Sequence, residues 1–181
     1  MAKEFVIELH RKFICDHYIS GKLTIPELGF ECDTLEYSFL ENDKFHRPLE
    51  AGRYELNTKY IDRNPYAAHV KGKRNSEALF QKPERNEALK SESIMVGKLE
   101  SLFSMDHRSE TANDAFIALN VSVRNVALSG GREMYLDILD DDSRVMKNID
   151  TECDEEDEKP KSFGMTDEEL ERMFDEYVKD D

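Results

Sequence analysis

Cysteine and histidine are the residue types best suited to nucleophilic chemistry, and one such pair stands near the N-terminus. Cys15 and His17 are two residues apart, so on a strand both side chains would lie on one face. A thiolate beside an imidazole is the nucleophile and base of cysteine-type acyl transfer. That reaction also needs a third group to orient the histidine, and strand alternation alone produces the same spacing. We therefore expect Cys15 and His17 to be packing residues.

The other thiol and imidazole groups show no metal-binding pattern. The three cysteines lack a Cys-x-x-Cys pair, which predicts reduced thiols. Three histidines lie in segments predicted to be loops, without the spacing of zinc ligands. We predict no metal site and no cofactor. The residues concerned are Cys32, Cys153, His46, His69 and His107.

Basic residues gather in one polar segment and suggest a contact surface. Arg63, Lys71, Lys73 and Arg74 are interleaved with tyrosines around a glycine. Such a cluster could contact an anion or an acidic protein, including the chain's own acidic tail. A solvated loop is the alternative that the sequence leaves open.

The elements that must position these residues form a β-rich body over residues 1–139. Apolar and polar residues alternate along several short segments of this stretch, and helical spacing occurs only once. The expected fold class is α+β: a mostly antiparallel, sandwich-like or barrel-like body with one main helix. The short connections, among them a turn at 20–22, favour a meander, and residues 63–92 are predicted to be loops. The expected strands are 5–17, 22–25, 30–37, 49–56 after its opening turn, 93–97 and 132–139, and the helix is 111–128.

Three segments in order along the body carry a family resemblance. They are Cys32–Glu36, Leu49–Leu56 and Ser93–Gly97, the last followed by the helix and the final strand. Residues 5–139 resemble a family of unknown function common in phages and prophages, itself similar to the L,D-transpeptidase (YkuD-like) fold. Members of that family typically show an Ile-Pro-Ala-Gly-x-Tyr turn, a His-x-Gly-Asn loop and a Gly-Cys-Ile-Leu-Val-Gly strand.

The resemblance implies a site from which the reacting groups are missing. Ser93 stands where the family has its cysteine, and Gln81 stands about where it has its histidine, with Asn86 in the same loop. A serine hydroxyl without a base is essentially un-ionised at neutral pH, and a glutamine cannot accept its proton. We therefore expect a degenerate transpeptidase-like scaffold with no catalytic residues.

The C-terminal part of the chain is predicted to be an acidic linker, 140–165, followed by a docking helix, 166–179. Residues 140–181 hold 18 acidic and 6 basic residues, so they carry −12 of the net charge of −15. A capping box, Thr166–Glu169, starts the helix. One apolar stripe follows at helical spacing, and a helix this short needs a surface to be stable. The stripe, predicted to bind a partner or the protein's own body, comprises Leu170, Met173, Phe174, Tyr177 and Val178.

These features together predict a non-catalytic structural or adaptor protein, of a phage virion or a phage-derived element. The expected partner is another protein or a neighbouring copy of the chain. The acidic charge makes nucleic acid an improbable partner, and no stretch has the 18 apolar residues of a membrane span. The N-terminus lacks a signal peptide, which predicts a location in the cytoplasm or in a particle assembled there. The open alternatives are a peptidoglycan-active amidase-like or transpeptidase-like enzyme, and an acidic inhibitor acting in immunity or anti-defence.

Overall fold

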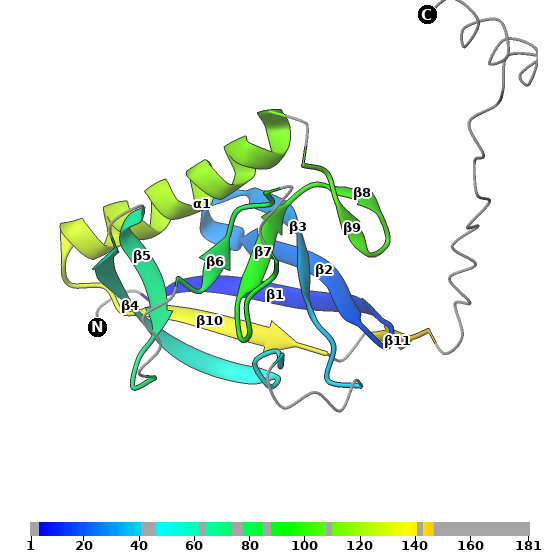
Figure 1. Cartoon of the computed structure of the whole chain (residues 1–181). Coiled ribbons are helices and arrows are strands. Elements are labelled where there is room, and N and C mark those ends of the chain that lie inside the picture. Colours follow the sequence, from blue (N-terminus) through cyan, green and yellow to red (C-terminus); the bar gives the residue numbers. More distant parts are fainter. Residues whose placement is uncertain are drawn as a thin grey trace, which may run out of the picture. The chain divides into compact units, whose positions relative to one another are not determined.

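The computed structural model describes residues 4–40, 46–61, 64–73, 78–84, 88–107, 110–140 and 143–146. All of them belong to the first of two units of the chain, Met1–Lys147, and that unit is strand-rich with one α-helix (Figure 1). The predicted docking helix, 166–179, lies outside the described residues, as does most of the predicted linker. The elements are β1 Phe5–Ile14, β2 Tyr18–Ile25, the 3-10 turn η1 Pro26–Leu28, β3 Phe30–Tyr37, β4 Gly52–Ile61, β5 Asn64–Val70, β6 Phe80–Gln81, β7 Ile94–Gly97, β8 Leu99–Ser101, β9 Ser104–Met105, α1 Glu110–Ser129, β10 Met134–Leu139 and β11 Arg144–Val145.

The main sheet curls into a nearly closed barrel. Its strand order is β5-β4-β10-β1-β2-β3-β7-β6, and β11 adds to the end of β1. Most neighbours are antiparallel, while β1 pairs with β10 and β11, and β6 with β7, in parallel. The two ends of the sheet approach each other where the Leu79 amide donates to the Ala68 carbonyl at 2.9 Å. The predicted strand-rich body with one helix is confirmed, and its sheet is barrel-like.

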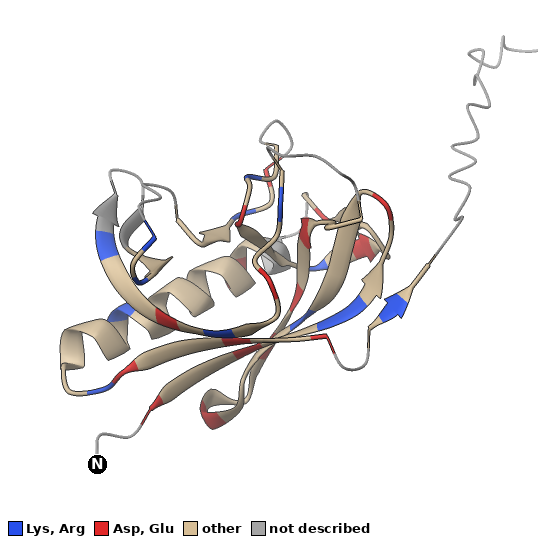
Figure 2. Cartoon of the chain, turned by 90° about the horizontal axis from the view of Figure 1, so that it is seen from below, with Lys and Arg blue, Asp and Glu red and all other residues tan. Residues whose placement is uncertain are grey.

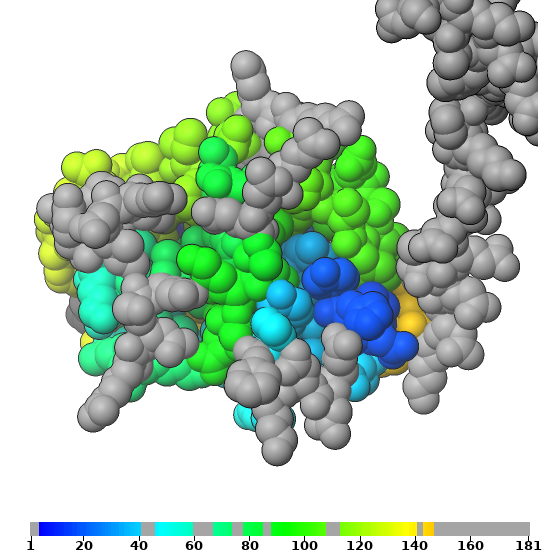
Figure 3. Space-filling model, viewed as in Figure 1, coloured from blue at the N-terminus to red at the C-terminus, as the bar shows by residue number. Residues whose placement is uncertain are grey.

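The core fills the barrel from alternate strand positions and from one side of α1. Phe5, Ile7 and Leu9 of β1 are fully buried, as period-two alternation requires. Leu119 and Val123 of α1 join the same cluster, and α1 packs against β5 and β7 (Figure 1). Figure 3 shows the helix along one edge of this unit. The helix therefore covers the side on which the sheet does not close.

The predicted turn at 20–22 is wrong, because these residues lie inside β2. Gly21 has a packing reason rather than a turn. A Cβ at Gly21 would lie 2.5 Å from the His10 carbonyl oxygen and 3.2 Å from the Arg11 Cα. A glycine inside a strand marks such a close approach of two backbones.

The strand predicted for 5–17 ends at Ile14, after a bulge. The pairing of β1 with β2 shifts register between Arg11 and Phe13. The alternation of residues 5–11 would bury Phe13, but Ile14 is buried instead. Cys15 and His17 are therefore not on one strand face. They lie in the connection to β2, where the Cys15 amide donates to the Tyr18 carbonyl at 2.9 Å.

Candidate functional site

Gln81 lies in β6, and Ser93 directly precedes the neighbouring strand β7. β6 and β7 are parallel, with Phe80 opposite Ile94 and Gln81 opposite Met95. Phe80 and Ile94 belong to the barrel core. Side chains alternate along a strand, so Gln81 points to the other side of β6 from Phe80, and both Gln81 and Ser93 are buried. The segment 63–92, predicted to be loops, thus contains β5 and β6.

Both of these side chains are held by the backbone. The Ser93 hydroxyl donates to the Ala78 carbonyl at 3.2 Å. The Gln81 amide group donates to the Ala88 carbonyl at 2.8 Å and accepts from the Lys90 amide at 3.0 Å. A carbonyl oxygen is too weak a base to take the serine proton at neutral pH. This arrangement fixes the local chain and does not activate the hydroxyl.

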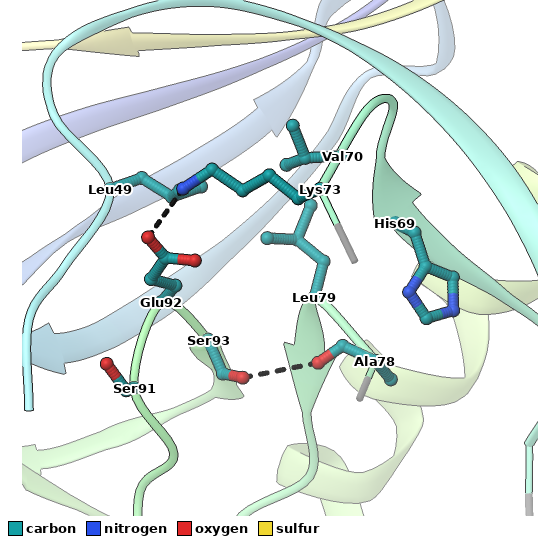
Figure 4. A pocket seen from close by; sticks show the side chains of 9 residues that line it. All are labelled: Leu49, His69, Val70, Lys73, Ala78, Leu79, Ser91, Glu92 and Ser93. Carbon is teal, nitrogen blue, oxygen red and sulfur yellow. Dashed lines mark hydrogen bonds and ion pairs between the residues drawn. The ribbon is translucent and has the colours of Figure 1, made fainter. Parts of the chain in front are cut away.

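A small hollow adjoins Ser93, and Figure 4 shows the side chains around it. It encloses about 30 Å³, room for about two water molecules. His69, predicted to lie in a loop, is a buried residue of β5 on its wall. The hollow is too small to admit an amide substrate without rearrangement. Its lining is Leu49, His69, Val70, Lys73, Ala78, Leu79, Ser91, Glu92 and Ser93.

The residue before Ser93 has an unusual backbone. Glu92 has a φ of 57°, in the left-handed region, and it is the only residue other than glycine with positive φ in the described part of the chain. Its amide donates to the Arg47 carbonyl at 2.7 Å. This conformation is destabilising for any residue that has a Cβ atom, whereas glycine adopts it without strain.

The predicted basic cluster is divided by the structure. Lys71 forms an ion pair with Glu55, and Lys73 forms one with Glu92. Acidic and basic residues are interspersed over the strands rather than gathered in one patch (Figure 2). The two lysines therefore face carboxylates of the body. The other predicted contact residues, Arg63 and Arg74, lie outside the described residues, as does Asn86.

Cys32 is buried in the core, which suppresses its reactivity. Burial, followed by the neighbouring Asp33 carboxylate, raises the pKa of the Cys32 thiol to about 12. The thiol is therefore protonated at neutral pH, and only a thiolate is a good nucleophile. Among the residues with described placement, no three His, Cys, Asp or Glu side chains are grouped to hold a metal ion.

A buried ion pair that the sequence pattern did not predict joins Arg11 and Glu36. Arg11 donates through Nε and Nη2 to the two carboxylate oxygens of Glu36, at 2.9 and 2.8 Å, and both side chains are 1% exposed. Nη2 also donates to the Leu49 carbonyl at 2.7 Å, and Nη1 to Asp140 at 3.3 Å. Burial raises the pKa of Glu36, and the bonds from Arg11 oppose that shift. The sequence does hold an indication that Arg11 is buried. Arg11 lies two residues after Leu9, in the series of inward-facing positions that begins with Phe5 and Ile7.

This ion pair joins two of the segments that carry the family resemblance. Glu36 belongs to one of them and Leu49 to another, and Arg11 binds both. Beside it lies a pocket of about 440 Å³, within the range of roughly 300–1,000 Å³ of small-molecule sites. Its lining is Arg11, Phe39, Arg47, Pro48, Leu49, Glu50, Ala51 and Asp140.

Comparison of the chain with known protein families, with curated proteins and with solved structures gives no match. Among the described residues, no helix has the length and apolar character that crossing a bilayer requires.

Proposed function

We propose that this protein is a non-catalytic structural or adaptor protein that contacts partners through its body and its C-terminal helix. One observation carries the proposal: the two side chains at the positions of the transpeptidase-like nucleophile and base are both bonded to backbone groups. Ser93 donates to a carbonyl, and Gln81 bridges Ala88 and Lys90. Neither arrangement supplies a base to a nucleophile.

The setting that we propose is a phage particle or a phage-derived element. It rests on the resemblance of the body to the phage-associated family. The backbone of Glu92 supports that resemblance, because the family's strand motif has a glycine directly before its cysteine. Glu92 directly precedes Ser93 and has the left-handed φ that favours glycine.

The surface of the body also supports a role in protein contacts. Ile117, Val121 and Leu128 are each about half exposed, and their spacing of four and seven residues places them along one side of α1. Exposed apolar groups that align in this way are typical of surfaces that meet other proteins.

The first test concerns the predicted docking helix. We expect deletion of residues 160–181, and the paired change Leu170→Asp with Phe174→Asp, to abolish self-association or partner capture. Asp175→Ala, on the polar side of the predicted helix, is the matched control and should leave both intact. Light scattering gives the mass of the assembly, and affinity capture identifies what binds. Unchanged association after the deletion would refute the role of the helix.

The second test concerns catalysis. Purified protein is incubated with peptidoglycan, and released peptides are measured for the wild type and for Ser93→Ala, Cys15→Ser and Cys32→Ser. We expect the wild type to release no more than the buffer. Release by the wild type that is lost in any of these variants would establish the enzyme alternative.

A further inference from the structure

The pocket beside Arg11 opens at one end of the barrel. It lies where β3 and β10 end and where β4 begins, and these three points lie close together at the lower edge in Figure 1. Barrel mouths are common places for ligand sites, because inward-facing side chains leave space there. The question is which chemical group this space suits.

The floor of the pocket has little capacity for an anion. Four hydrogen bonds already occupy the Arg11 guanidinium, two of them to the buried carboxylate of Glu36. Arg47 also lines the pocket, and it too has an interaction partner. The lining also holds two carboxylates, Glu50 and Asp140, so its formal charge is balanced. Because both guanidinium groups are already engaged, a cation between the carboxylates meets less competition than an anion would.

Both of these carboxylates are available to that cation. Within the described structure, the Glu50 side chain has no ion pair and no hydrogen bond, and the residue is exposed. Asp140 makes one long bond, at 3.3 Å, to Arg11, and its side chain is 32% exposed. A carboxylate has about four acceptor sites, so each can take several more donors.

The walls of the pocket suit an apolar stem. Phe39 is 49% exposed at the rim, and Pro48 and Ala51 line the space beside it. The neighbours of the pocket residues in sequence, Leu40 and Leu139, are also exposed apolar residues. Lysine and arginine bury their methylene stems on such surfaces, and a cation is attracted to an aromatic face.

We propose that this pocket binds the basic side chain, lysine or arginine, of a partner polypeptide, between the carboxylates of Glu50 and Asp140 and against Phe39. The inference rests on the proposed function and names the chemistry of one partner contact. Apolar residues around a charged anchor are the usual composition of a binding hot spot, in which arginine is enriched. This surrounding favours a polypeptide over a free amine as the source of the cation.

The test is a titration of the full-length protein with blocked tripeptides, followed by backbone amide shifts in nuclear magnetic resonance. The peptides are acetyl-Gly-X-Gly-amide with X as Arg, Lys, Leu or Glu, and agmatine serves as the free guanidinium compound. We expect the Arg and Lys peptides to shift the amides of Glu50, Ala51 and Asp140, and to bind at least as tightly as agmatine. The Leu and Glu peptides should not bind at this place.

Glu50→Gln is the decisive variant, because its side chain has no described bond to lose. We expect it to weaken binding of the Arg peptide about tenfold, the loss of one charge-assisted hydrogen bond, with unfolding unchanged. Glu55→Gln, farther along β4 and outside the pocket lining, makes the same charge change at a carboxylate paired with Lys71 and should weaken binding less than twofold. Phe39→Ala should weaken it as well, and Phe39→Leu less.

Three results would overturn the inference. The first is equal weakening by Glu50→Gln and Glu55→Gln, which would indicate unspecific attraction to net charge. The second is binding of the Glu peptide at the pocket, and the third is tighter binding of agmatine than of the Arg peptide. None of these bears on the C-terminal helix or on peptidoglycan release, so the proposed function fails only in its own deletion and peptidoglycan tests.

Discussion

Two regions of the barrel hold buried polar side chains, and they use them differently. At the hollow beside Ser93, neutral side chains bond to backbone groups, and little space is left. At the mouth beside Arg11, a charged pair bonds mainly side chain to side chain, and a pocket about fifteen times larger adjoins it. The first arrangement fixes the local chain around a small hollow. The second adjoins a pocket lined by the carboxylates of Glu50 and Asp140, which can accept further hydrogen bonds.

The contrast between the Ser93 hollow and the Arg11 pocket makes the Arg11 pocket the better candidate for a binding site. The resemblance directs attention to Ser93, whose hydroxyl is bonded to a backbone carbonyl. The segments that carry the resemblance instead meet at Arg11, whose guanidinium holds Glu36 and the Leu49 carbonyl together. Substitutions in the Arg11 region and in the Ser93 region should therefore differ in their effect on the free energy of unfolding.

The largest effect is expected from Arg11→Met. This change leaves the Glu36 carboxylate buried without its partner, and breaking a buried pair in this way costs about 3–5 kcal/mol of unfolding free energy. Denaturant titration at pH 7 measures the loss. Burial raises the pKa of Glu36, and removing Arg11 removes the opposing effect. Protonation of Glu36 at lower pH should therefore restore part of the variant's stability relative to the wild type.

The control is the double variant Arg11→Met with Glu36→Leu. Replacing both partners of a buried pair by apolar groups is often neutral or stabilising, so most of the loss should disappear. A double variant as unstable as the single one would show that the pair is not the cause.

The next largest effect is expected from Gly21→Ala, in the strand beside Arg11. In the register of the sheet, Gly21 lies between Arg11 of β1 and Thr34 of β3, so Arg11 reaches Glu36 across β2. Gly21→Ala would push a Cβ against the His10 backbone and should cost about 1–3 kcal/mol. The neighbour Ser20 is fully buried, and its hydroxyl lacks a hydrogen bond among the described residues. Ser20→Ala should therefore be neutral or slightly stabilising. Equal costs for the two changes would contradict the close approach at Gly21.

The parts of the fold that were predictable from the sequence are those that follow from local pattern. Period-two alternation gave the strands β1 and β3, and helical spacing followed by glycines gave α1 and its end. Gly130, which follows the helix, has the left-handed φ of 65° that terminates helices. The strand-rich class with one helix follows from these elements alone.

The parts that were missed depend on contacts between distant segments. The bulge after Arg11 changes the alternation, which removes Cys15 and His17 from the strand. β6 has only two residues, and its place is fixed by pairing with β7, which no local pattern shows. In the candidate site, the resemblance placed Ser93 on a strand and Gln81 in a loop, whereas Gln81 lies in β6 and Ser93 directly precedes β7. The burial of Arg11 was not predicted, because period-two alternation marks inward-facing positions by apolar residues and Arg11 is charged.

The hollow beside Ser93 should respond less than the Arg11 region. Gln81→Leu keeps the volume but leaves the Ala88 carbonyl and the Lys90 amide without their partner, which should cost about 1–3 kcal/mol. Ser93→Ala removes a single hydrogen bond and should cost about 1 kcal/mol. Denaturant titration gives both values, and amide exchange of residues 88–90 should rise only with Gln81→Leu. A loss as large as that of Arg11→Met would mean that the two regions do not differ as described.

The smallest effect is expected at Glu92, where two contributions oppose each other. Glu92→Gly relieves about 1 kcal/mol of left-handed strain. It also increases the entropy of the unfolded chain, which lowers the unfolding free energy by about 0.4–1 kcal/mol. In addition it removes an ion pair with Lys73, about one third exposed, that is worth less than about 1 kcal/mol. The net change in unfolding free energy should therefore be within about 1 kcal/mol of zero. Glu92→Val loses the same ion pair and adds a β-branched side chain to the left-handed backbone, so it should be clearly less stable than Glu92→Gly. Equal stability of these two variants would show that the backbone at Glu92 is not strained, and the support that its φ gives to the family resemblance would be lost.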